Sequence, residues 1–291
     1  MDKIGAIEAG GTKMVLAVCN KAGSIIERRE IPTTEPSDCL PKIIAWFKGR
    51  NIGSLGIGAF GPTCVNPKDP RFGQILDTPK VGWRHFNFLN ALSESFHVPI
   101  GYDTDANAAC LGEVVFGAAK GLDHVVYVTV GTGIGVGVMV RGHLLHGMLH
   151  PEAGHIRITK EINDIGKSVC PYHSDCLEGL ASGPSIESRW GNRAENLAKQ
   201  FEVWDLESSY LAKGLATYIL CYSPQRIILG GGVMYQKQLF PLIRRKVLES
   251  LGGYISTPEI HSINNYIIPP GCHGDQGILG AVELARQACD I

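Results

Sequence analysis

The chain has 291 residues, a formal net charge of -1 and an apolar share of 44%, which is typical of a globular protein with a sizeable core. This balance gives no sign of the basic surface that nucleic acid requires, so we expect no nucleic-acid partner. No apolar run is long enough to cross a bilayer, and the N-terminus has no signal-peptide pattern, so we predict a cytoplasmic protein without a membrane partner. In that compartment the nine cysteines are expected as thiols or metal ligands.

The first half of the chain is predicted to open with an antiparallel meander, because its strand-like segments are joined by short turns. A segment with apolar residues at helical spacing follows. The predicted elements of this half are strands at residues 4–8, 14–19 and 24–31, a helix at 36–49, strands at 55–60 and 99–102, and a helix at 105–116.

The pattern restarts near residue 125, where a strand, a glycine–threonine turn and a second strand repeat the order at the N-terminus. Such a repeat predicts two related halves, with the break between residues 113 and 121. Strands mixed with helices favour an α/β architecture. The predicted elements of the second half are strands at 125–130, 134–140 and near 144, a helix at 208–221, a strand at 226–229 and a helix at 277–288.

Three clusters stand out among the 36 glycines, and the first lies between two predicted strands. Gly10 and Gly11 let backbone N–H groups turn toward an approaching anion, while Thr12 and Lys13 add a hydroxyl and a positive charge. Glu8, at the end of the preceding strand, offers a carboxylate to a magnesium ion, directly or through water. The alternative interpretation is a plain hairpin turn with an exposed lysine.

The second cluster, Gly131-Thr132-Gly133, has the same chemistry at the corresponding place in the second half. Its spacing resembles a dinucleotide fingerprint, but the residues that follow alternate like a strand instead of opening a helix, so we reject an NAD site. Taken alone, the cluster also fits a tight glycine-rich hairpin. Together, two opposed glycine turns predict a site that grips a polyphosphate from both sides, which suits phosphoryl transfer.

The third cluster, Gly230, Gly231 and Gly232, follows a predicted strand. Glycines at such a place allow close approach of the base or sugar of a nucleotide. The alternative is a simple turn from a strand into a helix. We therefore add these three residues to the two turns as a hypothesis for nucleotide binding.

Asp105 lies where a predicted buried strand meets a helix. A hydroxyl that attacks the γ-phosphorus must lose its proton, and a carboxylate within hydrogen-bond reach accepts it. We therefore predict Asp105 as the general base. The alternative is that Asp103 or Asp105 merely caps the helix, and Asp103 is interpreted as structural or as support for the site from behind.

His155, Cys170, His173 and Cys176 form the pattern H-x14-C-x2-H-x2-C. These donors and their spacing predict a tetrahedral zinc ion, and the site would be structural because the protein fills all four positions. No position stays open for water, which argues against a zinc-dependent hydrolase. The alternative is a chance grouping of cysteine and histidine in a polar loop.

Two carboxylates accompany this cluster, Glu152 three residues before His155 and Glu178 two residues after Cys176. A metal clip would fix both toward a polyhydroxylated substrate, because carboxylates accept hydrogen bonds from paired sugar hydroxyls. Without other evidence, ordinary surface charge is the simpler interpretation of both residues.

Over nearly the whole chain, these motifs resemble the ROK family (repressors, open reading frames, kinases). The glutamate form of the first glycine motif and the short Cys-x2-His-x2-Cys cluster are most similar to its bacterial fructokinase branch. The motifs that carry the resemblance are Glu8-Ala9-Gly10-Gly11-Thr12-Lys13, Thr104-Asp105-Ala106-Asn107, Glu152-Ala153-Gly154-His155, the Cys170–Cys176 cluster with Leu177-Glu178-Gly179, and Gly274-Asp275-Gln276-Gly277.

The resemblance implies an actin-like ATPase (ribonuclease H-like) fold, with two α/β domains around a central cleft. It implies a small domain of residues 1–115 with a C-terminal helix at 275–291, and a large domain of residues 116–274 that carries the zinc-binding loop. ATP and Mg²⁺ are then expected between the two glycine turns, and a homodimer is expected.

The resemblance also implies roles for individual residues. Asp105 matches the catalytic aspartate of the family. Glu152, His155 and Glu178 match positions that touch the sugar, and His155 is at the same time a zinc ligand. The segment 230–232 matches the part of the family fold near the adenosine.

Two positions depart from the usual family pattern. Thr104 stands before Asp105, where many family glucokinases carry asparagine, so an amide contact to a sugar hydroxyl is replaced by a smaller hydroxyl or lost. This difference weakens a glucokinase assignment. His173 takes the place of a cysteine in the metal cluster, and zinc is kept because both donors suit it.

We therefore predict an ATP:hexose phosphotransferase that converts fructose to fructose 6-phosphate. Mannose, glucose and N-acetylmannosamine are the alternative substrates within the family. A non-catalytic sugar sensor is the alternative from a different class, and the intact Asp105 argues against it. No DNA-binding extension precedes Met1, so a repressor is not expected.

Overall fold

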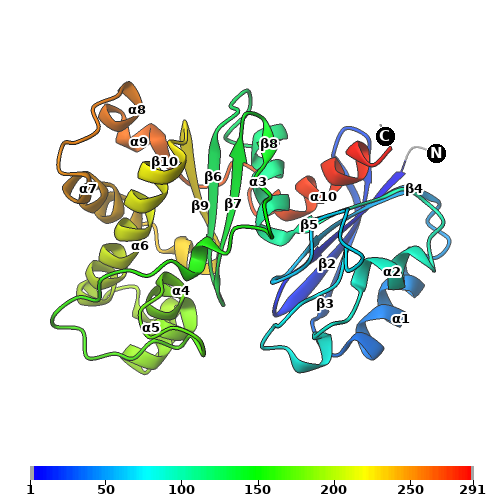
Figure 1. Cartoon of the computed structure of the whole chain (residues 1–291), viewed down its shortest axis with the longest axis horizontal. Helices are drawn as coiled ribbons and strands as arrows, with labels where there is room; N and C mark the ends of the chain where they lie inside the picture. Colours follow the sequence, from blue (N-terminus) through cyan, green and yellow to red (C-terminus); the bar gives the residue numbers. More distant parts are fainter. Residues whose placement is uncertain (1–2, 290–291) are drawn as a thin grey trace. The chain divides into compact units, whose positions relative to one another are not determined.

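The computed structural model describes residues 3–289, which fold into two compact units (Figure 1). The first unit comprises residues 1–121, 144–151 and 271–291, of which 1–2 and 290–291 lie outside the described residues. The second comprises residues 122–143 and 152–270. Residues 144–151 thus belong with the first unit, although they follow the predicted boundary at 115–116. The predicted extents of the two domains stay a prediction.

The first unit is built on a sheet of five strands in the order β3-β2-β1-β4-β5. β1 pairs antiparallel with β2 and parallel with β4, so a hairpin meander continues into a parallel half. The strands are β1 (Lys3–Ala9), β2 (Lys13–Asn20), β3 (Ile25–Pro32), β4 (Ile52–Ala59) and β5 (Ile100–Thr104).

Helices cover both faces of this sheet, which explains why β1 is apolar almost without interruption. Ile4 and Ala6 pack in one core with α10, whereas Ile7 and Ala9 pack in another core with α1 and α2. Side chains of successive strand residues point to opposite faces, so both faces of β1 are buried. The helices are α1 (Pro36–Phe47), α2 (Phe88–Ser93), α3 (Asp105–Val115) and α10 (Gln276–Gln287), with a 3-10 turn η1 at Val81–Trp83.

The second unit contains another sheet of five strands, in the order β10-β9-β6-β7-β8. β6 pairs antiparallel with β7 and parallel with β9. In both sheets, the strands that come third, second, first, fourth and fifth along the chain lie in that order, which confirms the predicted repeat. The strands are β6 (Val125–Val130), β7 (Ile134–Val140), β8 (His143–Leu144), β9 (Arg226–Gly230) and β10 (Ile267–Ile268).

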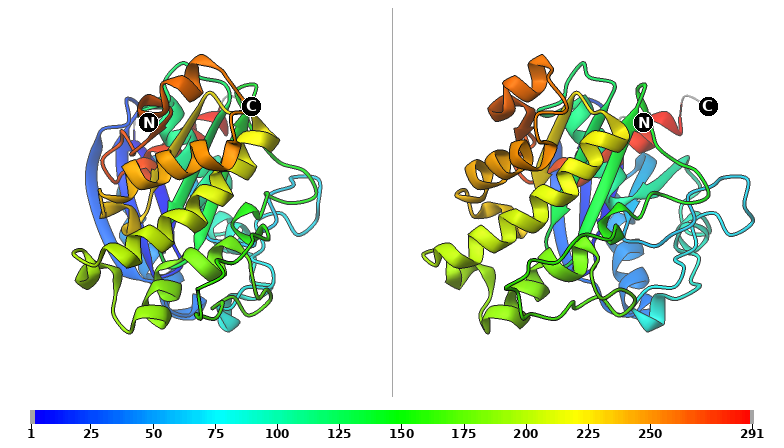
Figure 2. Two further views of the ribbon diagram at one scale, coloured as in Figure 1. Left: turned by 90° about the vertical axis from the view of Figure 1, so that its left-hand side faces the viewer. Right: turned by 60° about the vertical axis from the view of Figure 1, so that its left-hand side comes forward.

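Two long helices of the second unit, α6 and α7, lie side by side along its sheet (Figure 2). The predicted helix at 208–221 is the C-terminal part of α6, which begins at Phe201. Within residues 3–289, no helix is both long and apolar enough to cross a membrane. The helices are α4 (Leu177–Ala181), α5 (Gly183–Trp190), α6 (Phe201–Tyr222), α7 (Leu239–Leu251), α8 (Pro258–His261) and α9 (Ile263–Tyr266), with 3-10 turns η2 (Ala153–His155), η3 (Ala194–Leu197) and η4 (Gly232–Tyr235).

Candidate functional site

The first glycine turn closes the β1–β2 hairpin and is held in place by the residue that follows β3. Gly10 donates its N–H to the Lys13 oxygen at 3.0 Å. Thr33 donates its N–H to the Thr12 oxygen at 2.9 Å and its hydroxyl to the Gly10 oxygen at 2.7 Å. A Cβ at Gly10 would lie 2.9 Å from the Lys13 oxygen, so a side chain there would force the turn to shift. The turn is therefore rigid, with carbonyl oxygens already bonded.

Glu8, at the end of β1, lies against the start of α10. Gly277 leaves it room, because a Cβ there would lie 2.4 Å from the Glu8 carboxyl carbon. Burial, reinforced by the negative charge of Asp105, raises the pKa of Glu8 to about 7. Two carboxylates that oppose each other's ionisation form an arrangement that a divalent cation stabilises. Lys13, by contrast, already pairs with Glu30 on β3 at 2.9 Å.

Asp105 is the first residue of α3, and the helix begins here because Thr104 caps it. The Thr104 hydroxyl accepts the Asn107 N–H at 3.1 Å, which satisfies one of the free donors at the helix start. Thr104 is only 2% exposed, whereas Asp105 is partly exposed. The positive end of the helix dipole favours a negative charge at Asp105.

Asp103 supports this helix start through a buried hydrogen-bond network. One carboxylate oxygen accepts the Thr104 N–H at 2.7 Å and the Asn107 side-chain amide at 2.9 Å. The other lies 2.8 Å from Nε2 of His146. This hydrogen bond raises the pKa of His146. The arrangement agrees with the interpretation of Asp103 as support for the site from behind.

His146 and His150 are site residues that sequence reasoning left aside, because they lack metal-ligand spacing. His150 is buried, and its Nδ1 lies 3.5 Å from the Thr104 hydroxyl. Burial lowers the pKa of His150 to about 4, so its ring is neutral at pH 7. Both residues belong to the segment 144–151 of the first unit. The signal that could have found them is the run of three histidines, with His143, just before the Glu152 motif.

The second glycine turn closes the β6–β7 hairpin and is filled by a carboxylate. Gly131 donates its N–H to the Gly133 oxygen at 2.9 Å, which closes the turn. Oε2 of Glu178, on α4, accepts the Ile134 N–H at 2.9 Å. A Cβ at Gly133 would lie 2.6 Å from that oxygen. The glycine therefore lets Glu178 reach the backbone of the turn.

The third glycine cluster lies beside the second turn within the same unit. A Cβ at Gly131 would lie 3.9 Å from the backbone nitrogen of Gly232, at the start of η4. Gly231 has a φ of 90°, and a Cβ there would lie 2.4 Å from the Val130 oxygen. Only glycine suits that position. The structure thus brings these two predicted nucleotide-binding segments together.

The four predicted metal ligands converge, with all their ligand atoms within 4.8 Å of one another. Nδ1 of His155 lies 3.7 Å from Sγ of Cys170 and 3.6 Å from Sγ of Cys176. Nδ1 of His173 lies 3.6 Å from Sγ of Cys170. On its other side, Nε2 of His155 lies 3.7 Å from Oε1 of Glu178. His155 therefore lies between the metal-ligand cluster and the carboxylate of Glu178, which bonds to the second glycine turn.

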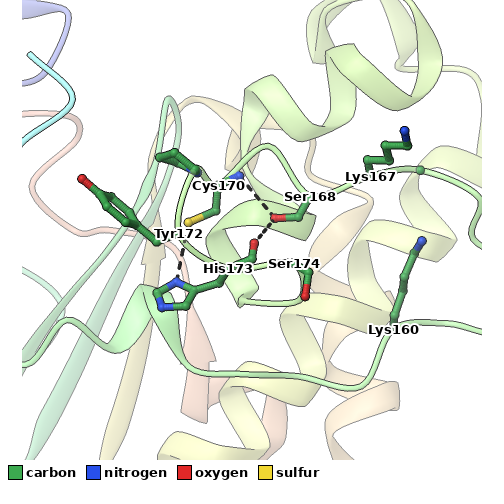
Figure 3. Close-up of a pocket in the computed structure, with 9 residues that line it drawn as sticks. Lys160, Lys167, Ser168, Cys170, Tyr172, His173 and Ser174 are labelled. Carbon is green, nitrogen blue, oxygen red and sulfur yellow. Dashed lines mark hydrogen bonds between the residues drawn. The ribbon is translucent and has the colours of Figure 1, made fainter.

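The loop that carries two of these ligands is shaped by Ser168 (Figure 3). Its hydroxyl donates to the His173 oxygen at 2.6 Å and accepts the Cys170 N–H at 3.2 Å. These bonds hold Cys170 and His173 on one tight loop. The loop borders an open hollow of about 430 Å³. Lys160 and Lys167, drawn in Figure 3, also line it. The predicted sugar-binding residues do not line this hollow.

Glu152 and His155 lie on one 3-10 turn. The Glu152 oxygen accepts the His155 N–H at 3.0 Å, and Ala153 O accepts the Tyr218 hydroxyl of α6 at 2.8 Å. A Cβ at Gly154 would lie 1.9 Å from the Ile134 oxygen of β7. The turn is thus pinned between a helix and a strand, and the Glu152 side chain is exposed.

Comparison with known proteins settles the family. A profile of the ROK family matches residues 4–288. The chain is 48% identical to a protein of Bacillus subtilis (strain 168), over 98% of this chain and 96% of that protein. It is 41% identical to the fructokinase of Pediococcus pentosaceus, over 98% of each chain. This chain belongs to the ROK family. The predicted family is therefore confirmed.

The fold agrees with this assignment. A ROK family glucokinase from Streptomyces griseus, solved in complex with glucose and AMPPNP, superposes with a TM-score of 0.80. The superposition covers 98% of this chain and 99% of that one, at 24% sequence identity. The predicted actin-like α/β fold is thereby confirmed.

Proposed function

We propose that this chain is an ATP-dependent fructokinase that transfers the γ-phosphoryl group of ATP to a hydroxyl of fructose, giving fructose 6-phosphate and ADP. The observation that carries the proposal is the 41% identity to the Pediococcus pentosaceus fructokinase over 98% of both chains. The capped helix start that presents Asp105 supplies the base that this reaction needs.

Asp105 accepts the proton of the sugar hydroxyl as that oxygen bonds to the γ-phosphorus and the bond to ADP breaks. General-base catalysis of this kind contributes about 10²- to 10⁴-fold to a rate. The buried network of Asp103 and Asn107 fixes the helix start, so that the carboxylate of Asp105 does not have to be ordered at the moment of reaction. The Thr104 hydroxyl serves this positioning, since it caps the same helix.

Glu152, His155 and Glu178 bind hydroxyl groups of the sugar. Glu152 precedes His155 in the sequence and Glu178 follows it, and both carboxylates accept hydrogen bonds. The Ile134 N–H holds Glu178 in place. A carboxylate fixed in this way discriminates between sugars by the positions of their hydroxyl groups. An acceptor that is left without a hydrogen bond costs binding free energy.

The glycine turns bind the nucleotide. Gly11 and Thr12 offer backbone and hydroxyl donors to phosphate oxygens, and Gly10, whose N–H closes the turn, keeps the approach free of a side chain. Thr132 and Gly133, with the neighbouring segment 230–232, provide a second set of donors and room for the adenosine, and Gly131, whose N–H closes the turn, adds no side chain to the approach. Mg²⁺, when bound, would neutralise the phosphate charge, and Glu8, a carboxylate opposed by the charge of Asp105, would hold the ion or its water. Lys13, which the sequence motif predicts as a phosphate ligand, is left out of this proposal because it pairs with Glu30.

The cluster of His155, Cys170, His173 and Cys176 fits a structural zinc ion. Bonds of about 2.3 Å to sulfur and about 2.0 Å to nitrogen in a tetrahedron place sulfur and nitrogen about 3.5 Å apart. The sulfur–nitrogen distances given above are 3.6 to 3.7 Å. Oε1 of Glu178 lies 3.7 Å from the second nitrogen of His155, on the side from which a carboxylate orients a histidine ligand. Zinc here would couple the loop to a sugar-binding carboxylate.

A coupled assay of ADP release tests the proposed reaction. Purified protein with MgATP is supplied in turn with fructose, mannose, glucose and N-acetylmannosamine, and kcat/KM is compared. We expect the highest kcat/KM with fructose. A higher value with another sugar would overturn the substrate, and no turnover with any of the four would overturn the activity.

The homodimer is also part of the proposal, and its support is the family resemblance alone. Sedimentation velocity at micromolar concentration measures it directly. We expect a species of twice the chain mass of 31.4 kDa. A monomer at every concentration tested would remove the dimer from the account and leave the chemistry untouched.

A further inference from the structure

Lys80 lies over the first glycine turn, although no sequence pattern connects the two. Around the position that a Cβ would take at Gly11, the nearest atom is Cε of Lys80 at 3.8 Å, and nothing else lies within 4 Å. The face of Gly11 is therefore open apart from one lysine side chain. Lys80 is partly buried, and it forms no ion pair within residues 3–289.

The loop that carries Lys80 is anchored to the same segment that holds the glycine turn. Trp83, 1% exposed in the core, donates its indole N–H to the Thr34 oxygen at 2.6 Å. The preceding residue, Thr33, makes the two hydrogen bonds to the turn described above. Arg84 donates to the Thr78 oxygen at 2.6 Å and closes the loop. Segment 33–34 thus fixes the turn on one side and the Lys80 loop on the other.

The lysine that belongs to the glycine motif is differently placed. Lys13 pairs with Glu30 on β3 at 2.9 Å. Glu30 also pairs with Arg28 at 3.2 Å. The positive charge of Lys13 is therefore already matched by a carboxylate, whereas that of Lys80 is not. An anion at Gly11 would meet the charge of Lys80.

We propose that Lys80 is the phosphate-binding cation of the first glycine turn. The sequence motif by itself predicts Lys13 for this role. Lys80 contacts the terminal phosphates of ATP from the side opposite the backbone of Gly11. This inference rests on the proposed function for its ligand. It deepens that function by naming the side chain that neutralises charge as the γ-phosphoryl group leaves.

The test compares Lys80→Met with Lys13→Met, which removes the other lysine in the same way. Binding of AMPPNP and of AMP is measured by isothermal titration calorimetry. For Lys80→Met we expect the affinity for AMPPNP to fall by about ten- to a hundredfold, the loss of one charge-assisted hydrogen bond. Its affinity for AMP should stay unchanged. For Lys13→Met we expect changes below about threefold for both ligands. Lys80→Arg keeps the charge and should bind AMPPNP within about threefold of wild type.

Equal AMPPNP affinity in Lys80→Met and wild type would overturn the proposal. A larger loss in Lys13→Met than in Lys80→Met would overturn it too, as would wild-type protein that binds AMPPNP no more tightly than AMP. A thermal melt shows whether each variant is folded, and if Lys80→Met is not, Lys80→Gln takes its place. The readout needs no turnover, so absence of sugar phosphorylation would defeat the proposed function and leave this test intact.

Discussion

The two glycine turns close equivalent hairpins of two sheets with the same strand order, yet their surroundings differ. Over the first turn, the face of Gly11 is open and a lysine stands above it. At the second turn, the carboxylate of Glu178 reaches the backbone next to Gly133 and bonds to the Ile134 N–H. One hairpin thus has a lysine side chain over its open face, and the other has a carboxylate bonded to its backbone.

The helices and loops that adjoin each sheet at the end of the glycine turn explain this difference. In the first unit the helix after β5 begins with the capped Asp105, and a histidine-bearing segment packs behind it. In the second unit the helix that carries Glu178, α4, is capped by the metal-ligand candidate Cys176. The carboxylate at the turn also lies near the metal-ligand cluster through His155. Under the proposed function, the first unit supplies the base and is called here the chemical half, and the second unit supplies the sugar-binding carboxylates and is called the recognition half.

The largest expected effect breaks the chemical half. Asp105→Asn keeps the size of the side chain but removes the base, so we expect kcat to fall by about 10²- to 10⁴-fold. Fructose affinity, measured by calorimetry, should stay within about threefold of wild type. The matched control is Asp123→Asn, an exposed residue of the second unit, which should leave kcat unchanged. Unchanged turnover in Asp105→Asn would remove it as the base.

The second effect breaks the metal cluster of the recognition half. Cys170→Ser should abolish stoichiometric zinc in elemental analysis and lower Tm by about 5 °C or more, because a structural metal contributes folding free energy. The control is Cys221→Ser, an exposed free cysteine on α6, which should keep both zinc and Tm. Wild-type protein that is purified without zinc and is fully active would contradict this prediction.

A third change separates recognition from chemistry. Glu178→Gln removes the charge that accepts the Ile134 N–H and faces His155, so we expect KM for fructose to rise about tenfold while kcat changes little. Glu187→Gln, on the exposed side of α5, is the matched control and should change neither constant. A loss confined to kcat would assign Glu178 to the chemical half instead.

The smallest effect concerns His146. Its pKa is raised in the folded state by Asp103, so the pair stabilises the fold fully below about pH 6.5, and this contribution is lost as the pH rises through the raised pKa. In urea denaturation, His146→Asn should cost more at pH 5.5 than at pH 8.5. The difference should stay below about 1 kcal/mol, since the side chain of His146 is 36% exposed. His143→Asn is the control, and a pH-independent cost would refute the pairing.

Most of the fold could be predicted from local sequence patterns. The hairpin strands at 125–130 and 134–140 were predicted to the residue, because short turns and alternation are properties of neighbouring residues. The helix α7 and the two-residue strand β10 were not predicted. The buried apolar residues of α7 lie at helical spacing, so its signal was present in the sequence, whereas β10 is too short to show alternation.

The residues predicted for the candidate site are those that lie in sequence motifs, and the residues that packing alone brings to these motifs were not predicted. Asp105 and Glu178 each had another interpretation from the residues alone, and the family resemblance favoured their roles in the site. The four metal ligands are predicted from their spacing. Lys80 and His146 are not, because only the tertiary structure brings them to Gly11 and Asp103. Spacing also favours Lys13 as the cation, and the Glu30 partner that competes for it lies on another strand.

The most direct test of the whole account is a ³¹P NMR spectrum of MgATP and fructose incubated with the wild-type protein. We predict a new phosphomonoester signal of fructose 6-phosphate that grows in step with ADP. Release of inorganic phosphate without a sugar phosphate, or phosphorylation at another fructose hydroxyl, would contradict the account.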